Sequence, residues 1–582
     1  MEKTENLGKM NFFQTSFTVR AVSYAAIILN LASIVLGLVY LAMMTSYTVL
    51  WDIFGVIYLL TLFCNVLLVF LDSIRLNRLN KTGHQLSKIG YLYLSFMVLA
   101  MLGIFFGNVL YSVTYAPELT ANGGAFILIY FSFFAVLSLG GAIAYLNLKY
   151  LKIGEIWDQT QSKMSSTRPT LGKMVLMGIC YLVLGVGIYF VFLTLFGASL
   201  ASGDINGAVG MFVAQFDLFF VFLVLCTTVI LLKLKNRRAS PRSYYGVAIV
   251  GLVISAILMA PLCATPYAIA SADQNFTAAF GSNWQNNISA SVEERYFLKT
   301  PFATPEYFLG MITTNYLVNA NIKFYDAEGI QLYFDAYLPT GDRDALPGNN
   351  SVIIRIHGGG WTAGDKGLAN MMQMNKYFAA QGYVVFDIQY GLVGDDWEIL
   401  PTPAHVRGNF TVDDMVRHIG NFTKYLVLHA NEFGANVDSV FISGGSAGGH
   451  LTCAVGLGMV SGNYSTIFGT GLNIKGIVPF YPANGHAAIF GGSDVFINPD
   501  DHLVNASSPP CLVFQGLEDG IVHPSISQDL KDAYTAAGNP DCAVLYFPFG
   551  GHAADFYFTG YYNQVFLYYM ERFLYLCVNN YF

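Results

Sequence analysis

The sequence predicts a chain of two unlike parts: an α-helical transmembrane domain of about seven spans, followed by an α/β domain with a mostly parallel sheet covered by helices. Two observations support this prediction. Long apolar runs recur as far as residue 269, and short β-rich runs alternate with helical stretches from about residue 325 onward. We therefore expect a membrane domain over 1–269, a stalk or cap over 270–324, and the α/β domain over 325–582.

The first part has the composition of a membrane domain. Hydrophobic residues make up 54% of the 582-residue chain and charged residues only 12%, which is too apolar for an ordinary soluble protein. A membrane span needs about 20 apolar residues, and runs such as "AFILIYFSFFAVLSLGGAIAYL" lack the polar face of a helix from a soluble core. The seven candidate spans are 20–46, 48–72, 89–113, 125–147, 174–196, 208–232 and 245–269.

The distribution of charge predicts the side of the membrane that each part occupies. Residues 1–269 contain 17 Lys and Arg, all of them before the first span or in the loops that follow spans two, four and six. Because basic loops stay in the cytoplasm, the N-terminus is expected there, and seven spans then put the second part outside the cytoplasm. That part holds 28 of the 37 acidic residues, which argues against nucleic acid as a partner.

Seven short runs of the second part are predicted as strands. Several are apolar throughout, as strands buried on both faces of a sheet must be. Helix-like stretches such as 415–433 lie between them, whereas 270–324, rich in aromatic residues and asparagine, does not follow the alternation. The predicted strands are 330–338, 351–357, 383–390, 439–445, 474–481, 511–516 and 542–548.

A glycine-flanked serine follows the predicted strand 439–445. The segment Gly444-Gly445-Ser446-Ala447-Gly448 has the spacing G-x-S-x-G and precedes a helix-like run. A serine at the tip of a tight strand-to-helix turn needs small neighbours, and the start of the next helix favours negative charge beside it. Taken alone, the motif fits an idle serine in a glycine-rich turn equally well. Its context makes Ser446 a candidate nucleophile.

A second glycine-rich segment, "HGGGW" at 357–361, follows the strand 351–357. A serine nucleophile generates an oxyanion that must meet preorganised N–H donors. Glycines let the backbone come close enough to supply them. The backbone amides of Gly359, Gly360 and Ala447 are the candidate donors of this oxyanion hole.

A base and an acid complete the set. Asp519 and His552 lie in the loops after the last two predicted strands. A serine hydroxyl needs an imidazole to take its proton and a carboxylate to fix the tautomer of that imidazole. The strand-end position and the preceding Gly550-Gly551 favour His552. The competing residues are Glu518 for the acid and His450, His486, His502 and His523 for the base.

Three segments resemble the α/β-hydrolase fold, and more narrowly the hormone-sensitive-lipase-like esterases: "IRIHGGGWTAGDK", "ISGGSAGGHL" and "SSPPCLVFQGLEDGIV". The resemblance covers roughly residues 325–580. It implies a nucleophilic Ser446, a His552 base oriented by Asp519, and cleavage of carboxylic esters, from short acyl esters and acetylated sugars to arylesters. Members of this family are commonly soluble, so the membrane domain departs from its pattern.

Neither a cofactor nor a metal is expected. Serine chemistry requires none, histidines and cysteines do not cluster at ligand spacing, and "GGSAGG" lacks the lysine of a phosphate-binding loop. The expected partners are a small-molecule or lipid-like ester and membrane lipid. Cys511 and Cys542 begin two neighbouring predicted strands, which leaves both a disulfide and free buried thiols open.

The membrane domain has more spans than an anchor needs, and one acidic residue stands out in it. Asp217 lies near the middle of the span 208–232. It marks either a polar pathway or a protonated or hydrogen-bonded structural residue. Its candidate partners, which serve equally as interhelical contacts, are Asn30, Asn65, Asn108 and Gln215.

Two functions follow from these observations. The first is a membrane-bound serine esterase that faces outward and works through an acyl-enzyme. The second is a transporter, sensor or adhesion protein whose hydrolase-like domain only binds. A complete Ser-His-Asp set with both elements of an oxyanion hole favours the esterase.

Overall fold

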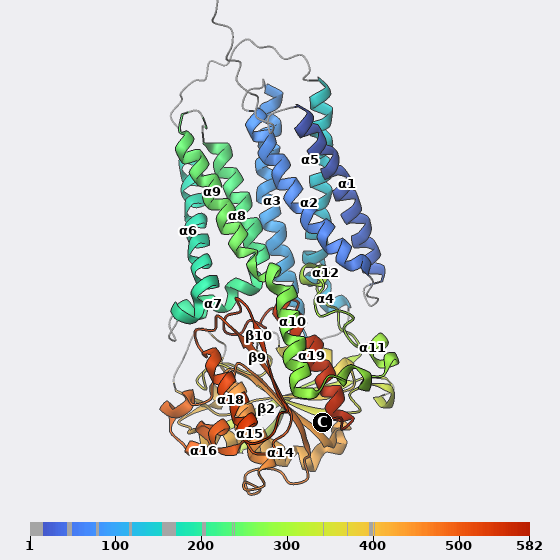
Figure 1. Cartoon of the computed structure of the whole chain (residues 1–582), viewed down its shortest axis with the longest axis vertical. Helices are drawn as coiled ribbons and strands as arrows, with labels where there is room; N and C mark the ends of the chain where they lie inside the picture. Colours follow the sequence, from blue (N-terminus) through green and yellow to red (C-terminus); the bar gives the residue numbers. More distant parts are fainter. Residues whose placement is uncertain are drawn as a thin grey trace, which may run out of the picture.

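The chain folds into two structural parts, a helical bundle and a sheet covered by helices (Figure 1). The structure is a computed structural model that describes residues 16–43, 49–76, 81–115, 119–153, 170–200, 205–235, 237, 239–341, 343–368, 371–394, 400 and 402–582. The bundle is blue to green in Figure 1, and the sheet part is yellow to red. The last bundle helix, α10 (Ala260–Phe280), leads directly into the sheet part.

Within the ranges just given, seven helical segments are long and apolar enough to cross a membrane, which confirms the predicted number. Four are single helices: α1 (Ser16–Ala42), α2 (Val49–Leu76), α3 (Lys81–Ser112) and α6 (Leu171–Leu200). Three are composite: α4 (Leu119–Phe126) with a π-helical turn (Ile127–Phe131) and α5 (Ser132–Ile153), α7 (Ile205–Val213) with α8 (Asp217–Leu234), and α9 (Pro241–Leu258) with α10.

The sixth span is not the continuous helix that the sequence predicts. A 3₁₀ turn over Ala214–Phe216 separates α7 from α8, and Phe216 has φ −110° and ψ 10°, outside the helical range. Figure 1 shows α7 at the end of the bundle next to the sheet part. Asp217 is therefore the first residue of α8, directly after the break.

The four candidate partners of Asp217 bond elsewhere and join different elements, which is the other alternative that the sequence leaves open for them. The carboxylate oxygens of Asp217 have no hydrogen-bond partner within the described residues. Asn30 and Asn65 bond each other between α1 and α2 at 2.8 and 3.1 Å. Asn108 donates to the backbone carbonyl of Phe308 at 3.0 Å, and Gln215 donates to that of Ala553 in the sheet part at 3.1 Å. Each amide finds an acceptor in another element, as polar groups in a membrane domain generally must.

The sheet part is built on eight strands in the order β1-β2-β4-β3-β7-β8-β9-β10. The strands from β4 to β10 in this order are parallel, and β1 and β2 are antiparallel at one edge. All seven predicted strands are present: β2 (Ile330–Pro339), β3 (Ser351–Ile356), β4 (Val384–Ile388), β7 (Asn436–Gly445), β8 (Ile474–Phe480), β9 (Cys511–Gly516) and β10 (Cys542–Phe547). A separate two-stranded ladder joins β5 (Leu392–Val393) and β6 (Arg407–Gly408).

The sequence does not predict β1 (Tyr316–Ala327), which forms the edge of the sheet. Most of its twelve residues are exposed or half-buried, and its pairing with β2 is interrupted between Asn319 and Ile322. A search for apolar runs misses such a strand, because an edge strand with wet faces needs few apolar residues. The sheet therefore begins at residue 316, before the expected domain boundary at 325.

Alternate residues of the central strands belong to two different cores, as the pleat requires. Ile354 and Ile442 share one core with α14 (Val412–Phe433) and α15 (Ala447–Val460). Ile353 and Phe441 belong to the other core, which includes α13 (Met371–Ala380), α19 (Tyr561–Val578) and the interior of the bundle. The two structural parts thus share a continuous hydrophobic interior.

Of the segment 270–324, predicted as a stalk or a cap, residues 270–315 lie between the two parts, and the rest belongs to β1. α10 continues to Phe280, and the short helices α11 (Ala290–Tyr296) and α12 (Thr304–Leu309) follow it. Arg572 of α19 bonds the carboxylate of Glu293 at 2.8 Å, and α12 packs on α2 and α3. These contacts are those of a connecting segment.

Cys511 and Cys542 are register partners at the start of β9 and β10. Both are buried free thiols. Of the two alternatives that the sequence leaves open, the structure has the free thiols.

Candidate active site

Ser446 lies at the turn between β7 and α15. Its φ of 58° and ψ of −119° form a backbone conformation that costs a non-glycine residue roughly 1–3 kcal/mol. Small neighbours make the turn possible: a Cβ on Gly448 would lie 2.2 Å from the carbonyl oxygen of Ile356. The strained turn holds the serine at the carboxyl end of the sheet while α15 packs closely on β3 and β7.

His552 and Asp519 form a hydrogen-bonded row with Ser446. His552 Nε2 lies 3.0 Å from Ser446 Oγ, and His552 Nδ1 lies 2.9 Å from Asp519 Oδ2. The three side chains follow β7, β9 and β10, and parallel strands place their carboxyl ends at the same edge of a sheet. The structure therefore brings together the three residues that the sequence singles out.

Asp519 is fully buried, and its second oxygen is also bonded. Oδ1 accepts hydrogen bonds from the backbone N–H groups of Ile521 at 2.9 Å and Val522 at 2.8 Å. These two donors fix the orientation of the carboxylate and direct Oδ2 at His552. The sequence does not reveal them, because any residue except proline supplies a backbone N–H.

Three of the four competing histidines are hydrogen-bonded to other groups. His450 is buried, lies with Nε2 2.7 Å from the carbonyl oxygen of Phe496, and has its pKa lowered to about 4 by burial. His502 bonds a surface carboxylate at 2.8 Å, and His523 caps the start of α18 (Pro524–Ala536). His486 is exposed at the start of a 3₁₀ turn. His552 alone among these five lies within hydrogen-bond distance of Ser446 Oγ.

Glu518, the competing acid, points toward the bundle instead of toward His552. Its Oε2 accepts a hydrogen bond from the backbone N–H of Ala198, near the end of α6, at 3.2 Å. Partial burial raises the pKa of this carboxyl group. The two adjacent acids therefore have different partners: Asp519 bonds His552, and Glu518 joins its loop to the membrane part.

The segment Gly358–Gly360 passes directly beside the serine. A Cβ on Gly358 would lie 3.4 Å from the Cβ of Ser446. Gly359 has φ 115°, a backbone conformation that residues other than glycine rarely adopt. The three predicted oxyanion donors, the amides of Gly359, Gly360 and Ala447, thus lie on the two segments that flank Ser446.

Tyr481 is a residue of the site that the sequence does not predict. It follows β8, its ring centroid lies 4.6 Å from that of His552, and its hydroxyl donates to Asp555 Oδ1 at 2.7 Å. Burial and the neighbouring Asp555 raise the pKa of this hydroxyl well above its usual range. The neutral tyrosine packs against the imidazole. Its strand-end position is the one signal in the sequence, and aromatic residues are common at such positions.

Comparison with known families identifies the domain that holds this site. Residues 334–485 match the model of the BD-FAE family. The matched range contains Ser446 and the Gly358–Gly360 segment. Ser446 lies in a tight strand-to-helix turn of the eight-stranded sheet, as a serine nucleophile does in α/β-hydrolases. The chain carries an α/β-hydrolase domain. Asp519 and His552 of this hydrolase domain lie beyond the matched range.

Individual relatives are esterases of low identity. The "Probable carboxylic ester hydrolase LipM" of Mycobacterium tuberculosis is 23% identical over 235 residues, which are 36% of this chain and 51% of the relative. The chain thus spans about half the length of this curated relative. Esterase B from Lactobacillus rhamnosis is 21% identical, with a TM-score of 0.34 over 42% of this chain and 81% of that chain. Thermogutta terrifontis esterase 2 is also 21% identical, with a TM-score of 0.34 over 45% and 91%.

The site offers the groups that acyl transfer requires. In the part of the chain that the structure describes, no three His, Cys, Asp or Glu side chains are grouped to hold a metal ion. The groups that converge are a hydroxyl, an imidazole and a carboxylate, with backbone amides beside them. Such a set can activate an oxygen nucleophile and stabilise an oxyanion.

Proposed function

We propose that the protein is a membrane-bound serine hydrolase that cleaves carboxylic esters on the extracytoplasmic side of the membrane by a Ser-His-Asp acyl-enzyme mechanism. The observation that carries the proposal is the row of bonds from Ser446 through His552 to Asp519, at 3.0 and 2.9 Å. A domain that only binds has no need for a buried base and acid aligned on one strained serine.

The chemistry follows from the positions of the atoms. Ser446 Oγ attacks the ester carbonyl carbon while its proton passes to His552 Nε2. The bond from the carbonyl carbon to the alcohol oxygen then breaks, and the proton on Nε2 goes to the leaving alcohol. A water molecule, deprotonated by the same nitrogen, then attacks the acyl carbon. The bond from this carbon to Ser446 Oγ breaks, the proton on Nε2 returns to Oγ, and the carboxylic acid leaves. Asp519 holds Nδ1–H throughout, so that Nε2 faces the serine.

The amides of Gly359, Gly360 and Ala447 would stabilise the oxyanion that forms in each attack. Ala447 is the first residue of α15, so its N–H is one of the amides that a helix start leaves without an intrahelical acceptor. The positive end of the helix dipole adds to this effect. Removing one such donor typically costs an enzyme about 10²–10³-fold in kcat.

The side of the membrane is supported by charge and by the arrangement of the helices. The junction of α8 and α9, which contains Lys235 and Arg237, lies at the end of the bundle away from the hydrolase domain (Figure 1). Basic residues mark the cytoplasmic end of a bundle. A hydrolase domain at the opposite end would act outside the cytoplasm.

The proposed substrate is an amphiphilic, lipid-like ester at the membrane surface. The loops that carry Glu518 and His552 contact α6 and the α7–α8 turn, so this edge of the sheet faces the bundle. An ester whose hydrocarbon part rests in the bilayer could reach this edge without leaving the membrane. A fully soluble ester would gain nothing from the placement.

One experiment tests both the activated serine and the side of the membrane. Cells that produce the full-length chain are treated, intact or permeabilised, with a fluorophosphonate probe that cannot cross membranes. We expect equal labelling in both samples and none for Ser446→Ala. Competition by a long-chain glycerol ester and by an acetylated sugar, added separately, then distinguishes the proposed amphiphilic substrate from a soluble one.

The possible outcomes separate the parts of the proposal. Labelling that needs permeabilised cells would keep the serine mechanism and reverse the orientation. A chain that is present and folded but unlabelled in both samples would contradict the mechanism. Stronger competition by the sugar ester would keep the mechanism and refute the lipid-like substrate.

A further inference from the structure

Gln215 joins the membrane bundle to the loop that carries His552. It lies in the 3₁₀ turn between α7 and α8 and is 1% exposed. Its Nε2 donates to the carbonyl oxygen of Ala553 at 3.1 Å, and its Oε1 accepts from the backbone N–H of Tyr557 at 2.7 Å. One side chain of the bundle therefore bonds both ends of the turn that directly follows the proposed base.

The turn that Gln215 holds is strained. Ala553 has φ 51°, in the left-handed region that a residue with a Cβ rarely adopts. A conformation of this kind persists where the surrounding structure enforces it. Because Ala553 is the neighbour of His552, a relaxation of this turn would move the imidazole relative to Ser446 Oγ.

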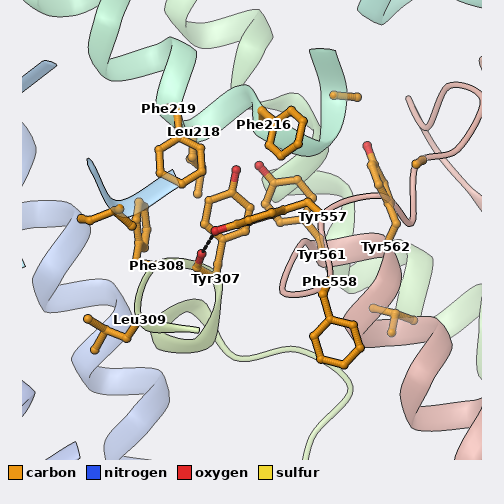
Figure 2. Packing of buried hydrophobic residues seen from close by; sticks show 14 of the residues in the cluster. Phe216, Leu218, Phe219, Tyr307, Phe308, Leu309, Tyr557, Phe558, Tyr561 and Tyr562 are labelled. Atoms are coloured by element: carbon orange, nitrogen blue, oxygen red, sulfur yellow. Dashed lines mark hydrogen bonds between the residues drawn. The ribbon is translucent and has the colours of Figure 1, made fainter. Parts of the chain in front are cut away.

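The contact between Gln215 and the turn is part of a closed set of bonds. The hydroxyl of Tyr307 donates to the carbonyl oxygen of Gln215 at 3.0 Å, and the hydroxyl of Tyr557 donates to the carbonyl oxygen of Tyr307 at 2.6 Å. Figure 2 shows Tyr307 and Tyr557 beside Phe216 and Phe219 of the bundle, with the Tyr557–Tyr307 bond dashed. Aromatic packing excludes water from these bonds, and low polarity strengthens them.

The loop of the proposed acid also rests on the bundle. The backbone N–H of Ala198 donates to Glu518, as described above, and a Cβ on Gly197 would lie 2.6 Å from the carbonyl oxygen of Glu518. On the other loop, a Cβ on Gly551 would lie 2.8 Å from the carbonyl oxygen of Gly210 in α7. The bundle thus touches the residues next to both Asp519 and His552.

We propose that Gln215 is a positioning residue for His552, and that the membrane bundle thereby completes the active site of the hydrolase domain. This inference rests on the proposed serine mechanism. It gives the bundle a task beyond anchoring: the break in the sixth span places an amide where it holds the catalytic loop. Gln215 acts through the backbone of Ala553 and Tyr557 and does not itself touch the reacting atoms.

The test uses the full-length protein in lipid nanodiscs, with a short soluble ester as substrate. Gln215→Leu keeps the approximate size and removes both bonds to the turn, together with the bond from Gln215 Nε2 to the carbonyl oxygen of Met211 in α7. We expect it to lower kcat at least about 10-fold and to change KM less than about 2-fold, because a small displacement of a reacting group slows chemistry more than binding. Fluorophosphonate labelling should slow by a similar factor, since the probe reacts with the same serine.

Gln215→Glu tests the positioning role through the pH dependence of kcat, which a purely structural role would leave unchanged. Protonated glutamic acid offers one donor and one acceptor, like glutamine, whereas the carboxylate has no donor and faces the carbonyl oxygen of Ala553. Relative to wild type at each pH, its kcat should be nearly restored near pH 5 and fall toward that of Gln215→Leu near pH 9. A ratio that does not change with pH would contradict the positioning role.

Asn65→Leu is the matched control. Asn65 is a bundle amide, 1% exposed like Gln215, and it bonds Asn30 of the neighbouring helix. Its loss should lower the thermal midpoint but leave kcat per labelled serine within about 2-fold of wild type. A Gln215→Leu protein with wild-type kcat and labelling rate would overturn the inference and leave the serine mechanism intact. An inactive, unlabelled wild type would overturn both.

Discussion

The membrane bundle and the hydrolase domain treat their apolar side chains in opposite ways. Ile28, Leu92 and Leu182 of the bundle are 65%, 70% and 68% exposed, whereas every residue of β3 and β4 is buried. Exposing a leucine side chain to lipid costs no free energy, because lipid tails are equally apolar. For the same reason, apolar burial contributes little to helix association in a membrane. In water, apolar burial is the main force that stabilises a fold. The two parts are therefore stabilised by different interactions, although one core runs through both.

The buried polar groups of the two parts also differ, since one part buries charged pairs and the other neutral groups. The hydrolase domain buries charged pairs, such as Lys366 with Asp335 at 3.0 Å and Arg572 with Glu571 at 2.7 Å. The bundle joins its helices by neutral groups, for example the hydroxyls of Ser33 and Thr61 at 2.8 Å. Charges are costly at the depth of the bilayer, and neutral hydrogen-bonded groups cost less.

The junction of the two parts uses a third kind of contact, from a side chain of one part to the backbone of the other. Tyr111 of α3 donates to the carbonyl oxygen of Thr313 at 3.1 Å and accepts from its N–H at 2.8 Å. Lys376 of α13 donates to three carbonyl oxygens at the end of α3. Where helices end, backbone groups lack intrahelical partners. The junction supplies those partners and so aligns the two parts.

The largest expected effect is a loss of activity in the hydrolase domain without a loss of stability. His552→Ala removes the proposed base and should lower kcat by about 10⁴-fold or more, with little change in the thermal midpoint. Ester hydrolysis by purified protein in nanodiscs measures it. His502→Ala, which removes a histidine that is 40% exposed and bonded to Asp494, should stay within about 2-fold of wild type. A folded His552→Ala protein of near-normal activity would refute the mechanism.

The next largest effect breaks the junction. Lys376→Met keeps the apolar stem and removes the ammonium that donates to the carbonyls of Tyr111, Ser112 and Thr114 at 3.0, 3.1 and 2.9 Å. Buried acceptors without a partner cost about 1–3 kcal/mol each, so the free energy of unfolding should fall by about 2–3 kcal/mol after partial relaxation. The thermal midpoint of the full-length protein in nanodiscs measures the change.

Lys424→Met is the matched control for the junction. Lys424 is an exposed lysine whose Nζ donates to the carbonyl oxygen of Thr466, within the hydrolase domain. Its loss should change the free energy of unfolding by less than about 0.5 kcal/mol. Equal midpoints for the two methionine variants would show that the lysine at the junction does not stabilise the arrangement.

The smallest effect, when it is expressed per pH unit, is a pH dependence of stability that arises within the hydrolase domain alone. Burial, with Asp335 nearby, raises the pKa of Asp387 to about 7. An unfolded chain releases this proton near pH 4. The stability that the protonated group contributes is therefore complete below about pH 4 and is lost as pH rises through 7, at roughly 1 kcal/mol per pH unit. Thermal midpoints between pH 4.5 and 7 measure the slope.

Asp387→Asn should flatten this slope, because the amide cannot titrate. Its oxygen can still accept the hydrogen bonds that Asp387 Oδ2 receives from the Gly367 N–H at 2.8 Å and from Asn375 Nδ2 at 2.9 Å. Asp438→Asn, at an exposed position, should keep the slope of the wild type. The same slope in all three proteins would mean that another group titrates.

Most of the fold was predictable because its signals are local. The apolar runs predict seven spans, and the short β-rich runs predict seven of the eight strands of the main sheet. The exposed edge strand β1 was not predicted, because it lacks a long apolar run. Ser446, Asp519 and His552 could be singled out because each lies in the turn or loop after a predicted strand, and parallel strands bring such loops to one edge of a sheet. Tyr481 could not, because its contact with His552 depends on how two loops pack.

Local patterns in the sequence predict a membrane part and an α/β part, the residues that follow the strands of the candidate site, and the segments in which charges gather. Composition, periodicity and strand-end position record these properties within short windows. The contacts between the two parts are visible only in the folded structure. Gln215 and Ala553 are 338 residues apart, and nothing in the sequence near either residue indicates the other. The physical reason is that a side-chain amide bonds whichever backbone groups the packed fold places beside it.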